Sequence, residues 1–165
     1  MVSAATPLDA GRAWAAAAAV PDPEVPCVTV ADLGILRDVR IEDGVAVARV
    51  TPTYSGCPAT LAIELAIETA LLQVGFDARI ERVLSPAWTT NWISDEGREK
   101  LRAYGIAPPE QETGSKMALF GETTVHCPRC NSANTEKLSE FGSTACKAQY
   151  RCLSCAEPFD YFKCI

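Results

Sequence analysis

Residues 51–58 read Thr51-Pro52-Thr53-Tyr54-Ser55-Gly56-Cys57-Pro58, and they connect two strongly patterned segments. Residues 45–50, before this stretch, are rich in valine and alanine and are bounded by turn residues, which favours a β-strand. Residues 59–74, after it, are apolar with the spacing of a helix. The pattern predicts a strand, a turn and a helix, with Cys57 as the N-cap and Pro58 as the first helical residue, where the missing N–H of proline costs nothing.

The position of Cys57 suggests chemistry. A thiol at a helix N-cap faces unpaired backbone amides and the positive end of the helix dipole, and both favour the thiolate form. A thiolate attacks electrophiles and binds metals. The alternative interpretation is a half-buried cysteine that only caps the helix, and the residues alone leave both interpretations open.

Composition and charge limit the classes of function. The chain has 165 residues, 48% of them hydrophobic, which suits one medium domain or two small ones with a real core. The formal net charge is −6, so the chain lacks the basic surface of a nucleic-acid-binding protein. We therefore expect no nucleic-acid partner.

The alanine-rich stretch 13–20 is too short to cross a bilayer, and it follows Asp9 and Arg12 instead of a basic leader. It is typical of a helix that starts with Thr6 as the cap and Pro7 as the first helical residue, with Asp9 completing a capping box. We therefore expect no membrane contact and a cytoplasmic location. In that compartment the eight cysteines are kept reduced, available for metal binding or chemistry.

The first 105 residues predict an α/β (α+β) domain with a three-stranded mixed sheet. A strand over 35–41 alternates apolar and polar residues, with Arg37 falling on the apolar side, and Asp43-Gly44 predicts a hairpin to the strand 45–50. Helix 59–74 ends at Gly75, and a strand over 78–84 then lies parallel to the second strand through a right-handed crossover. A last helix begins after Ser94 and ends at Gly105.

Two further features of this domain bear on function. Pro21, Pro23 and Pro26 hold Asp22 and Glu24 on a stiff loop, where these acids either face the Cys57 turn or are simply solvated. Helix 59–74 has only a narrow polar stripe, so its wide apolar face should cover the sheet and also contact a second surface. A second copy of the chain, giving a homo-oligomer, is one candidate.

The C-terminal third carries the strongest motif. Residues 106–118 contain Pro108-Pro109 and Gly114 and predict a linker, and residues 119–165 predict a small ribbon. Two Cys-x-x-Cys pairs supply four thiolates for one tetrahedral metal, with hairpin strands between the pairs: Cys127, Cys130, Cys152 and Cys155. We predict structural zinc, because the site is closed and the unit is small. A rubredoxin-like iron site, disulfides and an iron–sulfur cluster are the alternatives.

The remaining cysteines and the single histidine receive no ligand role. Cys146 and Cys164 are predicted to be packed in the ribbon, and His126 adjoins a ligand in a way that is awkward for one tetrahedral ion. No phosphate-binding loop, Rossmann glycine pattern or nucleophile elbow is present in the sequence.

The N-terminal motifs resemble those of the MIP18 (DUF59) family of iron–sulfur assembly factors over about residues 8–105. They are Asp22-Pro23-Glu24, Asp32-Leu33-Gly34, Ser55-Gly56-Cys57-Pro58 and Pro86-Ala87-Trp88. The ribbon adds two further motifs that point to a smaller group of proteins within this resemblance. They are the Phe141-Gly-Ser-Thr-Ala-Cys-Lys segment and the ending from Glu157 to Ile165. Together the two parts are similar to the family of D subunits of phenylacetyl-CoA epoxidase systems over nearly the whole chain.

This resemblance implies an accessory role and no catalysis by the chain itself. The implied task is to assist assembly or repair of the iron–sulfur cluster of the reductase subunit, so the expected partners are that reductase and, as a second choice, the oxygenase subunits. Cys57 would be the functional thiol that handles iron or a cluster transiently, with Asp22, Glu24, Thr53 and Ser55 around it. No role is transferred to Cys27.

Two other functions stay open at this point. One is a stoichiometric structural subunit of the epoxidase. The other is a thiol enzyme in which Cys57 attacks a coenzyme A thioester, although no base is identified for it.

Overall fold

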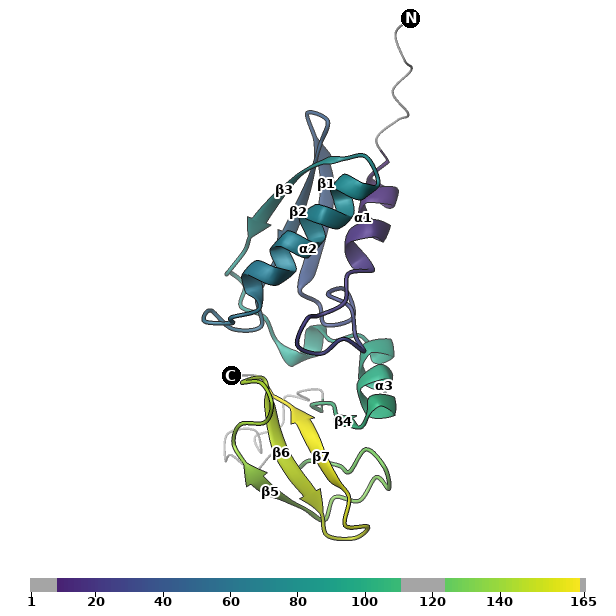
Figure 1. The fold of residues 1–165 in the computed structure, drawn as a ribbon, viewed down its shortest axis with the longest axis vertical. Helices are drawn as coiled ribbons and strands as arrows, with labels where there is room; N and C mark the ends of the chain where they lie inside the picture. Colours follow the sequence, from purple (N-terminus) through teal and green to yellow (C-terminus); the bar gives the residue numbers. More distant parts are fainter. Residues whose placement is uncertain (1–8, 111–123, 164–165) are drawn as a thin grey trace, which may run out of the picture. The chain divides into compact units, whose positions relative to one another are not determined.

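A computed structural model describes residues 9–110 and 124–163 of the chain (Figure 1). The chain divides into two compact units, Met1–Trp88 and Thr89–Ile165. The expectations for Thr6, Pro7 and Cys164 lie outside the described residues, as do those for residues 111–123.

The N-terminal unit contains the predicted three-stranded mixed sheet. Strands β1 (Leu36–Glu42) and β2 (Val45–Val50) pair antiparallel, and β3 (Asp77–Arg82) pairs parallel with β2 at the other edge. The hairpin turn has positive φ at both central residues, 48° at Asp43 and 84° at Gly44. This is the geometry of a tight hairpin that matches the twist of its strands, so the Asp-Gly signal is confirmed.

Strand β1 departs from the alternation that the sequence suggests. Its register with β2 shifts between Leu36 and Asp38, so Arg37 is the extra residue of a bulge. Arg37 is exposed and Leu36 is buried, whereas the alternation placed Arg37 on the apolar side and Leu36 on the polar side. The expectation was wrong at these two positions because one inserted residue moves the side chains before it to the opposite face of the sheet.

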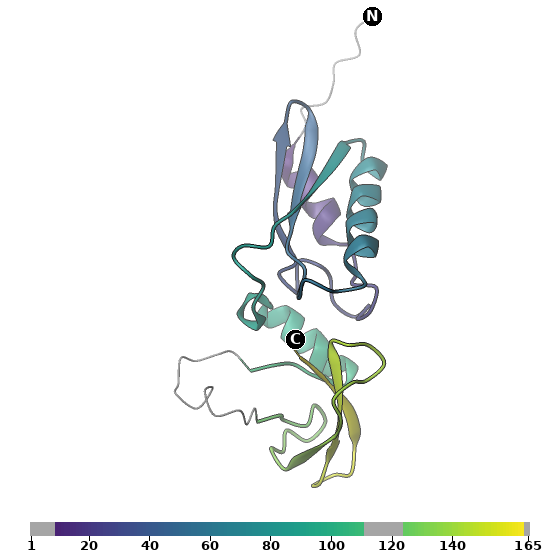
Figure 2. The same cartoon turned by 90° about the vertical axis from the view of Figure 1, so that its left-hand side faces the viewer.

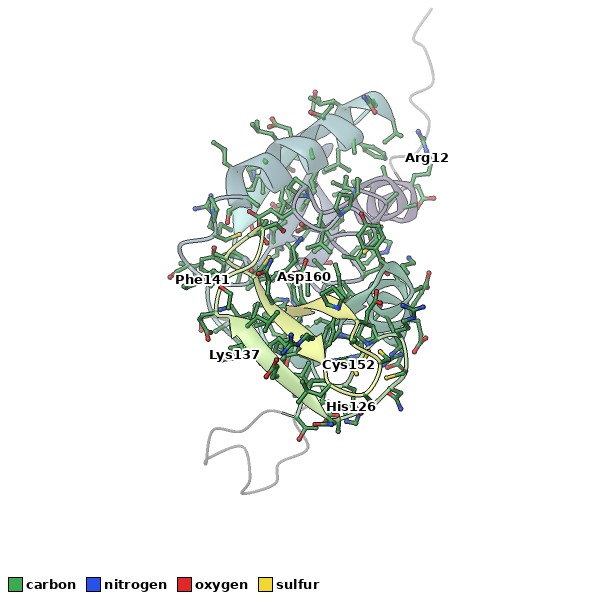
Figure 3. All side chains as sticks on the ribbon, turned by 60° about the horizontal axis from the view of Figure 1, so that its bottom comes forward. Arg12, His126, Lys137, Phe141, Cys152 and Asp160 are labelled. Atoms are coloured by element: carbon green, nitrogen blue, oxygen red, sulfur yellow. The ribbon has the colours of Figure 1, made fainter. Side chains whose placement is uncertain are left out.

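Helices α1 (Ala10–Ala18) and α2 (Thr60–Gln73) pack against each other and against the sheet (Figure 2). Asp9 is the N-cap of α1, because its Oδ1 accepts a 2.8 Å hydrogen bond from the Gly11 amide. The expectation that Asp9 lies inside the helix and completes a capping box was therefore wrong. Arg12 of α1, labelled in Figure 3, donates from Nη2 to the Val74 carbonyl at the end of α2, at 2.8 Å. A cation at that position complements the negative end of the helix dipole.

The core of this unit lies between the helices and the sheet. Ala13 and Ala17 of α1 are fully buried in this core, and one row of α2 side chains is also buried there. That row is Ile63, Ile67 and Leu71. Four charged residues of the sheet form a network of ion pairs with one another: Arg40, Glu42, Arg79 and Glu81.

The C-terminal unit contains the predicted ribbon. Strands β5 (Thr135–Ser139), β6 (Lys147–Cys152) and β7 (Pro158–Phe162) are antiparallel neighbours. The unit also holds the 3-10 turn η1 (Thr90–Trp92) and helix α3 (Asp95–Tyr104). As predicted, Ser94 caps α3 by accepting from the Gly97 amide at 2.9 Å, and Gly105 ends it with a φ of 94°.

A short fourth strand, β4 (Ile106–Ala107), changes the division that the sequence suggested. It pairs parallel with β7, so the sheet order is β4-β7-β6-β5 and these two residues are part of the ribbon sheet, not of a linker. Arg98 of α3 donates to the carbonyl of Thr90 at 2.6 Å and to that of Pro109, so α3 also belongs to this unit. The structural boundary therefore falls at Trp88, earlier than the expected boundary at residue 105.

None of the helices within residues 9–110 and 124–163 has both the length and the apolar character required to cross a bilayer.

Candidate functional site

Two similar turns bring the ribbon cysteines together. In the first, the Cys127 carbonyl accepts from the Asn131 amide at 2.9 Å, and Asn131 has a φ of 61°. In the second, the Cys152 amide donates to the Glu157 carbonyl at 2.9 Å, and Ala156 has a φ of 63°. In each turn the residue directly after the second cysteine is left-handed, which folds the chain back and points both thiols of the pair inward.

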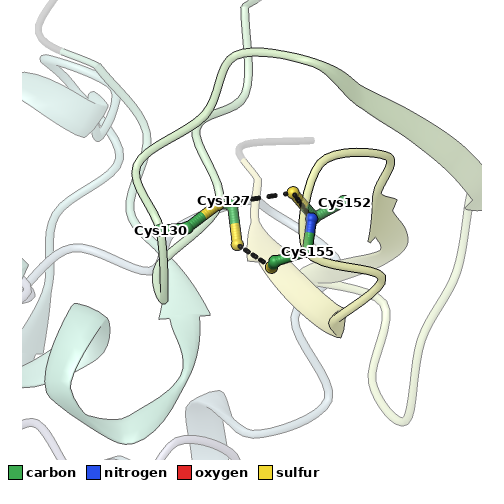
Figure 4. A group of neighbouring side chains, drawn as sticks. All are labelled: Cys127, Cys130, Cys152 and Cys155. Atoms are coloured by element: carbon green, nitrogen blue, oxygen red, sulfur yellow. Dashed lines mark hydrogen bonds between the residues drawn. The ribbon is translucent and has the colours of Figure 1, made fainter.

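The four sulfur atoms lie close enough together to share one metal ion. The Sγ atoms of Cys127, Cys130, Cys152 and Cys155 all lie within 4.8 Å of one another (Figure 4). The Sγ–Sγ distance is 3.8 Å from Cys127 to Cys155 and 3.5 Å from Cys130 to Cys152. A tetrahedral ion with sulfur ligands at about 2.3 Å separates them by about 3.8 Å, so the donor set fits a four-thiolate metal site.

The environment of these thiols differs from one to the next. Cys127 and Cys152 are buried, whereas Cys130 and Cys155 are exposed. The Cys155 amide, 3.5 Å from the Cys152 sulfur, and the Ser154 amide lower the pKa of Cys152 to about 7. The Glu157 amide acts to lower the pKa of Cys155, but desolvation and the neighbouring thiols raise it to about 12. A metal that binds all four as thiolates must therefore displace protons, and its affinity must depend on pH.

His126 and Cys146 lie outside this group of four. His126 contacts the Asn131 carbonyl through Nδ1 and the Glu110 carboxylate through Nε2, both at 3.1 Å. Cys146 is buried, with its sulfur 3.1 Å from Thr144 Oγ1. The motif therefore brings together the four predicted cysteines and no further ligand among the described residues.

The Cys57 turn has a different geometry from the one predicted. Helix α2 begins at Thr60, its N-cap is Ala59, and no side chain caps it. The Cys57 amide donates to the Tyr54 carbonyl and the Cys57 carbonyl accepts from the Thr60 amide, each at 3.2 Å. Two tight turns therefore precede the helix, and the prediction that Cys57 is the N-cap was wrong. Cys57 is half-buried, between the exposed residues Gly56 and Pro58.

Asp22 and Asp32 order the loop that precedes β1. Asp22 is 6% exposed, and its Oδ1 accepts from the amides of Glu24 and Val25 at 2.8 Å each. Asp32 accepts from the Thr29 amide at 2.9 Å and donates its own amide to the Thr29 hydroxyl at 3.1 Å. These bonds hold the backbone in place, so both carboxylates have a structural task in the loop.

This loop and the Cys57 turn lie at the same end of the sheet (Figures 1 and 2). The Thr51 amide donates to the Ile35 carbonyl at 2.9 Å, which joins the two segments where they leave the sheet. Glu24 and Thr53 are half-buried and Ser55 is exposed. That Asp22, Glu24, Thr53 and Ser55 surround the Cys57 thiol stays a prediction.

Trp88 has a role that sequence reasoning missed. Its indole Nε1 donates to the Leu33 carbonyl at 2.7 Å, and both residues are buried. The bond fixes the Asp32-Leu33-Gly34 turn to the segment after β3. A tryptophan predicts packing, and only the tertiary fold shows which carbonyl receives its N–H.

Comparison with known proteins separates the same two parts of the chain. Residues 12–81 match the family model described as "Iron-sulfur cluster assembly protein", and residues 111–163 match the one described as "PaaD zinc beta ribbon domain". A protein of Escherichia coli (strain K12), provisionally named as the D subunit of 1,2-phenylacetyl-CoA epoxidase, is 50% identical over 153 residues. The match covers 92% of this chain and 91% of that protein.

A solved structure supports the fold of the first unit. The crystal structure of a domain of unknown function, DUF59, from Bacillus anthracis is 27% identical, with a TM-score of 0.52. The match covers 56% of this chain and 90% of that chain. The α+β fold with a three-stranded sheet and the C-terminal ribbon, both predicted from the sequence, are thereby confirmed.

Proposed function

This chain belongs to the family of 1,2-phenylacetyl-CoA epoxidase D subunits, and from that membership we propose that it serves the phenylacetyl-CoA epoxidase system in aerobic phenylacetate degradation. Within that system we propose a non-catalytic accessory role: assisting the assembly or repair of the iron–sulfur cluster of the reductase subunit. The observation that carries this proposal is the match of residues 12–81 to the iron–sulfur cluster assembly family, because that range contains Cys57.

In this proposal Cys57 is the functional thiol. It is half-buried in a turn whose residues Ser55, Gly56 and Pro58 are exposed, so iron or a cluster has a route to the sulfur. Iron–sulfur clusters are held by cysteine thiolates, usually four of them. A chain that offers one thiol to its cargo holds that cargo incompletely, which suits transient handling and not permanent residence.

The ribbon has a structural part in this proposal. We propose that Cys127, Cys130, Cys152 and Cys155 hold one zinc ion, because four converging thiolates form a closed site with no open position for a substrate. Elemental analysis of protein purified without oxygen should find one zinc per chain. Iron at one per chain with a rubredoxin-type spectrum would overturn the choice of metal.

The maturation role is tested with Cys57→Ser in a strain that grows on phenylacetate. We expect normal amounts of the epoxidase subunits but reductase that lacks its iron–sulfur cluster, because serine is a poor ligand for iron in place of the thiolate. Iron and sulfide content of the purified reductase measures this directly. Cys27→Ser is the matched control, since Cys27 is also a half-buried cysteine of the N-terminal unit, and it should leave the cluster intact.

Two outcomes would contradict the proposal in different ways. Normal reductase clusters and normal growth with Cys57→Ser would reject both the residue and the role. Normal clusters with lost epoxidation would instead support a structural subunit, and a constant molar ratio with the oxygenase subunits after purification would agree with that result.

A further inference from the structure

Helix α2 exposes a row of leucines on the side away from the sheet. Leu61, Leu65 and Leu72 are 62%, 53% and 52% exposed, although they belong to a helix whose opposite side is core. At about 100° per residue, these three leucines and Glu68 fall within an arc of about 60°. We call these four residues the leucine face. Figure 2 shows α2 with one side along the sheet and the other side open.

Glu68 lies between Leu65 and Leu72 along the helix axis, at one edge of the leucine face, and its side chain is half-buried. Glu64, on the same helix, holds Arg82 with two hydrogen bonds of 2.7 and 2.8 Å. Across the described residues, Glu68 makes neither a hydrogen bond nor an ion pair, and α2 contains no lysine or arginine. A purely apolar cover would bury this carboxylate without compensation, which is unfavourable. The face is therefore complementary to an apolar surface that also carries a cation.

A second copy of the chain meets this requirement poorly. If two α2 helices pack antiparallel about a two-fold axis, Leu61 of one lies opposite Leu72 of the other. The same symmetry places the two Glu68 residues within about 5 Å of each other along the helix axis. Two like charges at nearly the same level of one interface disfavour the pairing.

We propose that the leucine face docks a client protein through a segment that presents aliphatic side chains and a lysine or arginine opposite Glu68. Helix α2 begins three residues after Cys57, so a client bound along it has one end next to the thiol. The identification of that client as the reductase rests on the proposed function. The docking surface itself rests on the exposure of the leucines and the unpaired carboxylate.

The test is the affinity of the full-length chain for the purified, cluster-free reductase subunit, measured by calorimetric titration at two salt concentrations. Leu65→Ser should weaken binding about tenfold, because it removes a central apolar contact. Glu68→Lys should weaken it by about tenfold or more and remove the loss of affinity with added salt. Leu84→Ser and Asp77→Lys are the matched controls: both residues are exposed in the same unit, lie off α2, and should bind like the wild type.

Each contrary result has one meaning. Unchanged affinity for Leu65→Ser and Glu68→Lys overturns the docking surface. A wild-type dimer in sedimentation equilibrium that Leu65→Ser converts to monomer assigns the face to a second copy and also overturns the proposal. The same titration is run with the oxygenase subunits. Binding to them alone keeps the surface but rejects the reductase as client, and binding to neither rejects the surface.

The Cys57→Ser variant separates docking from cluster handling. It should bind the reductase with unchanged affinity, because the leucine face is intact, while failing to support its cluster. If Cys57→Ser supports the cluster normally and the leucine-face variants still lose affinity, the docking surface stands and the proposed maturation role falls.

Discussion

The two units of the chain have cores built from different kinds of side chain. The N-terminal unit has a core of aliphatic side chains supplied by two helices and a sheet, including the fully buried Ala17, Ile67 and Leu71. The cluster beside the ribbon's four-thiol site contains Ala107, Val125 and Phe159, and its other buried members are two of the thiols themselves. In the ribbon, Cys127 and Cys152 are part of the core, whereas Cys57 lies in a half-buried turn of the other unit. The same residue type is therefore part of a core in one unit and lies in a half-buried turn in the other.

Backbone geometry around the thiols differs in the same way. In the ribbon, the Cys155 amide is directed at the Cys152 sulfur. At the Cys57 turn, the backbone bonds join Cys57 to Tyr54 and Thr60 through main-chain atoms. In the ribbon a backbone amide thus donates to a sulfur atom, whereas the hydrogen bonds from Cys57 to Tyr54 and Thr60 involve main-chain atoms alone.

The largest effect is expected for Cys152→Ser. Removing one of four thiolates should release the metal and unfold the ribbon, because metal binding supplies on the order of 10 kcal/mol to units of this kind. Elemental analysis and amide exchange should show metal loss and unprotected β6 and β7, with protection retained in α2. Cys146→Ser, also buried but outside the site, should keep the metal. Full metal content in Cys152→Ser would show that the ribbon does not depend on this thiol, and the contrast with the N-terminal unit would be lost.

A smaller effect, confined to the N-terminal unit, is expected for Trp88→Phe. The substitution keeps the aromatic bulk but leaves the buried Leu33 carbonyl without its donor, which should cost about 1–3 kcal/mol. Urea denaturation followed through N-terminal amides measures the loss. Trp14→Phe, at a site 39% exposed, should change stability little. Equal effects of the two substitutions would show that the Trp88 hydrogen bond contributes nothing.

For Cys57→Ser the expected change in stability is smaller still, about 1 kcal/mol or less, because the residue lies outside the core and contributes no capping bond to α2. Alkylation at neutral pH should modify Cys57 faster than the metal-bound thiols or the buried Cys146. Mass spectrometry after timed labelling would measure the order. If Cys57 were modified slowly, its assignment as the functional thiol would be weakened.

The smallest effect concerns Glu140 in the ribbon. Lys137, labelled in Figure 3, donates to its carboxylate at 2.8 Å and Lys163 does so at 2.9 Å, and together they lower the pKa of Glu140 to about 2. A depressed pKa means that the stabilisation is present above the ordinary carboxyl range and is lost as pH falls toward 2. The carboxyl chemical shift should therefore remain that of the ionised form at pH 4 while the ribbon is folded. Protonation at pH 4 in the folded protein would contradict the ion-pair geometry.

The sequence predicts those parts of the fold that depend on local signals. Asp43-Gly44 forms its hairpin, and Ser94 and Gly105 bound α3, because each of these signals acts over a few residues. The two Cys-x-x-Cys pairs converge over a longer distance, and their paired spacing is what identifies them. The start of α2 was misplaced because proline after Cys57 fits a turn as well as a first helical residue. The bulge at Arg37 depends on pairing with β2, which local alternation does not contain.

Strand β4 could not be predicted for a related reason. Two residues carry no periodicity, and the prolines that follow them are typical of a linker. Burial of Ile106 and Ala107 arises only when β7 lies beside them. The site neighbours of Cys57 depend on the same kind of long-range arrangement, and only the four ribbon cysteines can be identified from their spacing.

The pairing of β4 with β7 also determines how the chain can be divided experimentally. A cut anywhere in residues 111–123 separates β4 in sequence from the strand it pairs with, but the two pieces share one sheet and should remain together after cleavage. A fragment that ends near residue 110 would contain β4 without its partner strand β7, and α3 without the rest of the C-terminal unit. An N-terminal fragment that ends at Trp88 keeps the indole bond to Leu33 and leaves every strand of the ribbon sheet in the other piece.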